Sequence, residues 1–185
     1  ASPHDAARAG IVLVPEERKK QAIIPDMSVH DNLHVGRYGL NARNGILNLR
    51  ALAETTGRLV RDFNIRLAFS RQPISTLSGG NQQKVVVARC VQSNPRLLIV
   101  GEPTRGVDIG AKDEIHRRII DLAADGTAII VVSSELDEVL ALSHRVAVFS
   151  ERRMVDLLDK AEATPTRVME LATPRSRGEG TDVAA

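Results

Sequence analysis

Short apolar runs alternate with longer amphipathic segments along most of the chain. The apolar runs of strand length lie at residues 11–14, 97–100, 128–132 and 146–149. From capping signals or helical spacing of apolar residues, helices are predicted at 3–9, 50–63, 81–92, 111–124 and 135–142. Continuous apolar strands that alternate with helices are typical of a parallel sheet covered on both faces. The pattern therefore predicts an α/β fold.

Capping residues refine the boundaries of the short helices. Ser2 and Pro3 are typical of a helix start, and Gly10 suits the stop of the same helix. Residues 28–31 have the pattern of a capping box and predict a second short helix. Loops are predicted at residues 16–21 and 36–48.

The spacing of apolar residues also predicts which side chains are buried. The predicted buried positions on the three longer helices are Leu52, Leu59 and Phe63, then Val85, Val86 and Ala88, and finally Ile115, Ile119 and Leu122. Residues 128–132 carry no polar side chain, so this run predicts a fully buried strand.

Composition narrows the classes of function. Aromatic residues make up 2% of the 185 residues, which disfavours a platform that stacks single-stranded nucleic acid. The formal net charge is +2, and the absence of a run of like charges argues against a nucleic-acid partner. Cys90 is the sole cysteine, which excludes an internal disulfide and fits a reducing compartment. The longest apolar run, 128–132, is too short to span a bilayer, so a membrane role would be peripheral.

The stretch LSGGNQQK at residues 77–84 carries the clearest chemical signal. Ser78, Gly79 and Gly80 precede a predicted helix, and the first N–H groups of a helix favour an anion. Glycines let a backbone approach a ligand closely, and the serine hydroxyl adds a donor. An ordinary helix start explains the same residues on physical grounds alone.

This stretch resembles the signature motif of ABC-transporter ATPases, and its GNQQK continuation is typical of the branch that imports monosaccharides. Three further segments agree in order. LLIVGEP at 97–103 resembles the Walker B strand with its glutamate, TRGVD at 104–108 resembles the D-loop, and VSSEL at 132–136 occupies the place of the switch-histidine loop. The resemblance covers residues 2–172 and implies the P-loop NTPase-like fold of an ABC ATPase with an inserted helical subdomain.

The resemblance implies roles for individual residues. Ser78, Gly79, Gly80 and Gln82 would face the γ-phosphate of ATP held by the opposite nucleotide-binding half. Glu102 would orient the attacking water, and the remaining nucleotide-binding positions are Asp108 in the D-loop, Ser134 at the switch position and Glu16 at the Q-loop position. ATP and Mg²⁺ are the implied cofactors, at a composite site built mostly by the partner half.

Two departures from the family pattern affect this chain's own site. Gly101 stands where the Walker B aspartate helps to hold Mg²⁺, and glycine offers only a backbone carbonyl. Ser134 stands where a histidine contacts the γ-phosphate, and a hydroxyl cannot carry positive charge. A plain N-cap for the helix at 135–142 is an alternative role for Ser134. The expectation is a weak or silent local site beside an intact signature.

The expected domain organisation follows from the same resemblance. No GxxxxGK[ST] occurs in the chain, so the N-terminal strands and the Walker A loop are expected to be missing. Residues 1–172 are expected to form a partial nucleotide-binding domain, with a helical and signature subdomain at 26–92 and a sheet core at 93–160. Residues 173–185 are expected to be a disordered tail.

The function implied is that of the ATP-binding subunit of a monosaccharide importer. Its partners would be the other nucleotide-binding half, membrane permease subunits and, indirectly, a periplasmic sugar-binding protein. It would lie peripherally on the cytoplasmic face of the inner membrane. A non-transport ABC ATPase of DNA repair or translation and a non-catalytic docking module are the alternatives.

Two smaller hypotheses concern residues 16–50. The apolar residues there would contact a coupling helix of the permease or pack within the helical subdomain: Met27, Val29, Leu33, Val35 and Tyr38. His30 and His34 share a helix face at i and i+4, but no further ligand has metal-site spacing, so no metal site is predicted.

Overall fold

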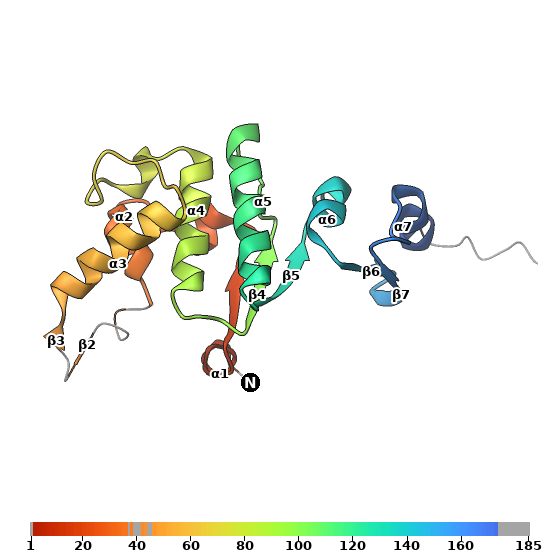
Figure 1. The fold of residues 1–185 in the computed structure, drawn as a ribbon, viewed down its shortest axis with the longest axis horizontal. Coiled ribbons are helices and arrows are strands. Elements are labelled where there is room, and N and C mark those ends of the chain that lie inside the picture. Colours follow the sequence, from red (N-terminus) through yellow and green to blue (C-terminus); the bar gives the residue numbers. More distant parts are fainter. Residues whose placement is uncertain (1, 37, 39–41, 44–45, 174–185) are drawn as a thin grey trace, which may run out of the picture. The chain divides into compact units, whose positions relative to one another are not determined.

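Three parallel strands form the main sheet of this protein (Figure 1). The computed structural model describes residues 2–36, 38, 42–43 and 46–173. Its contacts divide the chain into an N-terminal unit that ends at Ser134 and a C-terminal unit that begins at Glu135. None of the helices within the described ranges is long and apolar enough to cross a membrane.

The sheet of the N-terminal unit has the order β1 (Ile11–Val14), β4 (Leu97–Gly101), β5 (Ala128–Val132), and both strand pairs are parallel. The predicted parallel sheet is therefore confirmed for these strands. Because the carboxyl ends of parallel strands meet at one edge, the loops after β1, β4 and β5 begin together there.

The predicted first helix is confirmed as α1 (Pro3–Arg8). The Ser2 hydroxyl accepts a hydrogen bond from the Asp5 N–H, and the Asp5 carboxylate accepts one from the Ser2 N–H, which completes a capping box. Gly10 has φ +78°, the left-handed conformation that ends helices and favours glycine. The helix therefore leads directly into β1.

Two long helices pack next to the sheet strands. Helix α4 (Gly79–Val91) buries Val85, Val86 and Ala88, as predicted. Helix α5 (Ile109–Ala124) buries its predicted stripe of Ile115, Ile119 and Leu122. Each helix begins two residues before its predicted start, since the N-caps are Ser78 and Asp108.

A helical pair lies on the side of α4 away from the sheet (Figure 1). It consists of α2 (Val29–His34), which opens at the predicted Ser28 cap, and α3 (Leu49–Asp62). A 3₁₀ turn, η3 (Ile74–Thr76), then leads into α4. Leu52, Leu59 and Phe63 are buried, as predicted.

The structure corrects both loop predictions in this unit. Residues predicted as a loop after β1 include a π-helical turn, η1 (Arg18–Ala22), closed by the Ile23 N–H on the Arg18 carbonyl. Part of the predicted loop at 36–48 pairs as two short strands, β2 (Ala42–Arg43) and β3 (Ile46–Leu47). Residues 37, 39–41 and 44–45 of that loop lie outside the described residues.

Strand β5 is exposed at Ala128, Ile130 and Val132, so the prediction of a fully buried strand is wrong. The physical reason is that exposed and half-buried residues alternate along β5, so one of its two faces stays uncovered among the described residues. β5 is also an edge strand, hydrogen-bonded to β4 on one side only among the described residues.

The C-terminal unit contains α6 (Leu136–Leu142), β6 (Arg145–Ser150), β7 (Arg153–Asp159) and α7 (Pro165–Ala172). The sequence predicted α6 and β6 but missed β7 and α7. Strand β6 was expected in the parallel sheet, and the structure instead pairs it antiparallel with β7. The tight turn is formed by Glu151 and Arg152, which have positive φ.

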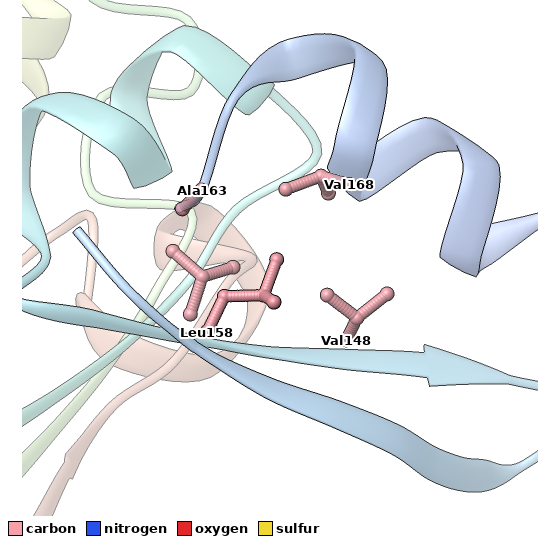
Figure 2. Packing of buried hydrophobic residues seen from close by; sticks show 5 residues of the cluster. Val148, Leu158, Ala163 and Val168 are labelled. Carbon is pink, nitrogen blue, oxygen red and sulfur yellow. The ribbon is translucent and has the colours of Figure 1, made fainter. Parts of the chain in front are cut away.

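A small apolar core holds the C-terminal unit together. In Figure 2, Val168 of α7 and Ala163 lie over Val148 and Leu158 of the β6–β7 hairpin. Val146 completes the buried cluster. The predicted tail is described only at Thr173, and residues 174–185 lie outside the described residues.

Candidate functional site

Three predicted site residues follow the three parallel strands at one edge of the sheet. Glu16 follows β1, Glu102 follows β4 and Ser134 follows β5. Their proximity is a consequence of topology, because parallel strands present all their carboxyl ends at the same edge. This edge is where α/β proteins place their ligands, so the sequence-predicted residues lie where a ligand would bind.

Glu102 and Ser134 contact each other directly. The Ser134 N–H donates to Glu102 Oε1 at 2.8 Å, and its hydroxyl donates to Oε2 at 3.1 Å. Glu102 itself has φ +46°, a left-handed conformation that costs energy for a residue with a side chain. The Glu102 N–H donates to the Val132 carbonyl at 2.7 Å, which fixes that conformation. The carboxylate is therefore held in one orientation and keeps two lone-pair positions for other donors.

This contact corrects the alternative role of Ser134. Helix α6 has Glu135 as its N-cap, with no side-chain capping bond. The Ser134 hydroxyl instead donates to the Glu102 carboxylate, which is a charge-assisted hydrogen bond.

Gly101 is in close contact with Glu16. A Cβ atom placed on Gly101 would lie 2.7 Å from Cγ of Glu16 and 3.3 Å from its backbone nitrogen. The stem of the Glu16 side chain therefore passes through the space where a side chain at position 101 would begin. The Glu16 carboxylate is exposed, and the structure records no hydrogen bond or ion pair for it among the described residues.

Ser78 caps the start of α4 and remains exposed. Its hydroxyl oxygen accepts hydrogen bonds from the Asn81 backbone N–H at 3.4 Å and from the Asn81 side-chain amide at 3.0 Å. The hydroxyl proton is still available to a ligand, because both bonds use the oxygen as acceptor. The start of a 13-residue helix thus presents a donor to solvent at its positive end.

The two signature glycines pack against other parts of the same chain. A Cβ on Gly79 would lie 2.7 Å from the Gly106 carbonyl oxygen, and a Cβ on Gly80 would lie 2.4 Å from Cβ of Ala111. Both separations are shorter than side chains tolerate, so glycine is required here for close packing. Asp108 caps α5 by accepting from the Ala111 N–H at 3.0 Å. The signature, the D-loop segment (residues 104–108) and the start of α5 form one compact group.

Gln82 lies elsewhere than the resemblance suggested. Its side chain is 6% exposed, and its amide donates to the carbonyls of Leu77 and Ile74 at 3.1 and 3.3 Å. These bonds hold the turn that precedes α4. The direct contribution of Gln82 in this structure is therefore to position the signature, not to present a donor to solvent.

Sequence reasoning missed Arg18. Its guanidinium donates to the Arg105 carbonyl at 2.6 Å and to the Gly106 carbonyl at 3.1 Å. Burial lowers the pKa of Arg18 from its usual value, and the group still carries its charge at physiological pH. No pattern in the sequence predicts this contact, because its two acceptors lie 87 and 88 residues after Arg18 in the chain.

A partly buried ion pair between α4 and α5 was also missed. Lys84 of α4 bonds Glu114 of α5, and the Lys84 ammonium also donates to the Asn64 carbonyl at 2.9 Å. The Lys84 side chain is 5% exposed. The hydrogen bond from Lys84 lowers the pKa of Glu114. The i to i+3 or i+4 rule cannot find this pair, since its members lie on different helices.

The described side chains provide few ligands for a metal ion. No group of three histidine, cysteine, aspartate or glutamate side chains with suitable geometry occurs among the described residues. At the sheet edge, Glu16 and Glu102 are the available carboxylates, and position 101 supplies none. Magnesium in nucleotide sites takes ligands from substrate phosphates and water as well as protein. A magnesium ion at this edge would therefore depend largely on phosphate and water ligands.

The buried His30 and His34 side chains both lie against Thr56 of α3. Thr56 Oγ1 lies 2.8 Å from His30 Nδ1 and 3.0 Å from His34 Nε2, and all three side chains are buried. Burial lowers the pKa of both imidazoles. The cluster therefore joins α2 to α3 as neutral side chains.

Comparison with known proteins agrees with this geometry. The family described as ABC transporter matches residues 2–105. A putative ribose/galactose/methyl galactoside import ATP-binding protein of Pseudomonas savastanoi pv. phaseolicola is 44% identical over 94% of this chain and 33% of its own length. An arabinose import ATP-binding protein of Pseudomonas syringae pv. syringae is 44% identical over 96% of this chain and 35% of its own length. The chain thus spans about a third of the curated relatives it matches.

The fold is also that of solved ATP-binding cassettes. The dimeric structure of a cassette in a post-hydrolysis state, bound to ADP and phosphate, matches with a TM-score of 0.71 at 17% identity. The match covers 86% of this chain and 68% of the other. With the sheet, the loop order and the matched residues in agreement, this chain belongs to the ABC transporter family.

Proposed function

We propose that this chain is the ATP-binding part of a monosaccharide importer and contributes the signature face of a composite ATP site. In this proposal the nucleotide is bound by the opposite nucleotide-binding half. The start of α4 then approaches its γ-phosphate when the two halves close. Relatives named for ribose, galactose and arabinose import support the choice of substrate class.

The exposed start of α4 carries this proposal. Ser78 presents a hydroxyl at the positive end of the helix, where an anion is favoured. Behind it, Gly79 and Gly80 allow the D-loop segment and α5 to pack tightly, and Gln82 fixes the preceding turn. A rigid donor group that faces outward suits a phosphate bound by another half.

The sheet edge supports a weak local site. Glu102 is present and held by Ser134, but position 101 has no carboxylate and position 134 has no imidazole. Magnesium, when bound with ATP, neutralises the charge that develops on the phosphates. The family's full set of groups for that task is incomplete here, so hydrolysis is assigned to the site whose Walker B belongs to the partner.

The permease is proposed to contact the helical pair. Val29 and Leu33 are fully buried, which assigns them to packing within the helical part. Met27 is 41% exposed, and Phe69 in the same unit is 60% exposed. Each of these exposed side chains offers an apolar contact to a membrane subunit.

The remaining partners follow from the same proposal. A periplasmic sugar-binding protein would be contacted only through the permease. The chain would lie peripherally at the cytoplasmic face of the inner membrane. No contact among the described residues favours a DNA-repair or translation ATPase, and the import relatives favour transport.

The test places a large cation at the start of α4. In an importer assembled from this chain, its partner half and the permease, Ser78→Arg is expected to reduce sugar uptake about 100-fold, because it blocks approach of a phosphate. Ser75→Arg, at an exposed position three residues earlier, is the matched control and should transport normally. Unchanged uptake by Ser78→Arg would overturn the proposed role of the signature.

A further inference from the structure

Arg18 joins three segments that the sequence treats as separate motifs. It begins η1, just after the Q-loop position, and its two terminal nitrogens donate to consecutive carbonyls of the D-loop segment at 2.6 and 3.1 Å. The same guanidinium lies against the start of α4, since a Cβ on Gly79 would be 2.6 Å from its Nη2. One side chain therefore contacts the Q-loop side, the D-loop segment and the signature.

The geometry of this contact requires arginine. Two parallel bonds to neighbouring oxygen atoms need a planar group with donors in a fixed fork, whereas lysine is a point charge on a flexible stem. The D-loop segment is shaped to receive the fork. Gly106 has φ +65°, a conformation that favours glycine, and its carbonyl is one of the two acceptors.

Helix electrostatics do not explain why the cation lies here. The start of α4 is the positive end of the helix, where a cation is unfavourable. The Arg18 Nε–H is also buried without a partner among the described residues. The two carbonyl bonds must therefore outweigh these costs, which indicates that the contact holds the D-loop segment in a defined position.

We propose that Arg18 is a positioning residue that locks the D-loop segment against the start of α4, so that both reach the partner-bound nucleotide in register. This inference rests on the proposed function, because it concerns how the signature face is aligned. Arg18 touches no nucleotide in this role. Its effect is on the closed, reacting arrangement of the two halves and not on the initial binding of ATP by the partner.

The first experiment tests the lock itself and does not depend on transport. Hydrogen exchange is measured on the full chain with Arg18→Met, and with Lys19→Met as a control that removes a neighbouring, exposed positive charge. The amides of Arg105 and Val107, which donate to the carbonyls of Glu102 and Thr104, are expected to exchange at least about tenfold faster in Arg18→Met. Equal exchange in the wild type and both variants would overturn the proposal.

The second experiment tests positioning in the assembled importer. Arg18→Met is expected to lower kcat for ATP about tenfold and to change KM less than about twofold, because misplaced groups act only after closure. Arg18→Lys should give an intermediate kcat, since lysine reaches one carbonyl but not both, and Lys19→Met should match the wild type. A kcat for Arg18→Met within twofold of the wild type would overturn the inference.

The two proposals fail in different ways. If Ser78→Arg leaves uptake unchanged, the signature role is wrong, whatever Arg18 does. If Ser78→Arg abolishes uptake while Arg18→Met retains the kcat and the exchange rates of the wild type, the signature role stands and the positioning role of Arg18 is wrong.

Discussion

The start of α4 and the end of β4 differ in how they are built, although both were identified from family motifs. At the start of α4, Gly79 and Gly80 bring the chain into van der Waals contact with the D-loop segment and α5, while Ser78 stays exposed. At the end of β4, Glu102 is held by hydrogen bonds, and Gly101 leaves a gap that the Glu16 stem crosses. In our proposal, the motif at α4 is kept as a packed and exposed binding face, whereas the motif at β4 is weakened as a hydrolytic site.

The largest change in the free energy of unfolding is expected from disrupting the packing at the start of α4. Gly80→Ala would place its Cβ 2.4 Å from Cβ of Ala111, and overpacking of this kind costs about 2 kcal/mol of the free energy of unfolding. Urea unfolding followed by circular dichroism measures it. Gly57→Ala in α3 is the matched control. Only the end of the Arg61 side chain lies near it, so a gain of about 0.5–1 kcal/mol is expected.

If Gly80 packs closely against Ala111, Gly80→Ala and Gly57→Ala must change the free energy of unfolding in opposite directions. A stabilising effect of both substitutions would show that α4 and α5 are further apart than the structure places them. The start of α4 would then not be more tightly packed than the end of β4.

A second expected effect concerns the helical pair that supports the packed side. Burial lowers the pKa values of His30 and His34. Repulsion by Arg71 lowers the pKa of His30 further, and repulsion by His30 lowers that of His34, whereas Asp31 raises both. Folding therefore favours the neutral imidazoles. Their contribution to stability is complete above the unfolded pKa of about 6.5 and is lost as pH falls from there towards the lowered folded values.

The expected limiting slope is about 1.4 kcal/mol per pH unit for each imidazole that titrates. Urea unfolding between pH 7.5 and pH 5 (about the range of histidine titration) measures it. His30→Gln combined with His34→Gln should flatten the profile in this window, whereas His4→Gln, at an exposed position, should not. A wild-type profile that is already flat below pH 6.5 would contradict the assignment of buried neutral imidazoles.

A smaller change in the free energy of unfolding is expected at Gly101, the last residue of β4. Gly101→Ala should cost about 1 kcal/mol because its Cβ meets the Glu16 stem. In a Glu16→Ala background the same substitution should cost less, since Cγ is absent there. A double-mutant cycle on unfolding free energies measures the coupling, expected at about 0.5–1 kcal/mol. Strict additivity would mean that Glu16 does not occupy the space over Gly101.

The smallest effect is expected at Ser134. Ser134→Ala removes the hydroxyl bond to Glu102 but keeps the backbone N–H bond, so the loss should be about 0.5 kcal/mol. Ser134→Thr keeps a hydroxyl and should retain the stability of the wild type. Thermal unfolding of the two variants checks the difference, and equal melting temperatures would indicate that the hydroxyl bond contributes nothing.

Much of the fold was predictable because the controlling signals are local. The apolar spacing of α4 and α5, and the caps at Ser2 and Ser28, depend on residues within a few positions of each other. Helix starts were placed two residues late because the first turns of α4 and α5 contain glycines and polar groups. The family motifs further identified which strand ends carry Glu102 and Ser134.

The rest depended on contacts between distant parts of the chain. The β6–β7 pairing was missed because residues after the apolar run of β6 carry charges that obscure the strand pattern. Arg18 was missed because its acceptors are backbone carbonyls 87 and 88 residues away, which leave no side-chain signature. The motif alone predicts that Gln82 faces a nucleotide, whereas in the fold its amide turns inward to the Leu77 carbonyl.

In our proposal this chain supplies the signature, and the partner half supplies the hydrolytic site. ATP turnover by the assembled importer with Glu102→Gln tests it most directly. We expect at least about half of the wild-type kcat to remain, because Glu102 belongs to the incomplete local site in our proposal. A fall in kcat of about 100-fold would contradict it, since Glu102 would then be the working catalytic carboxylate.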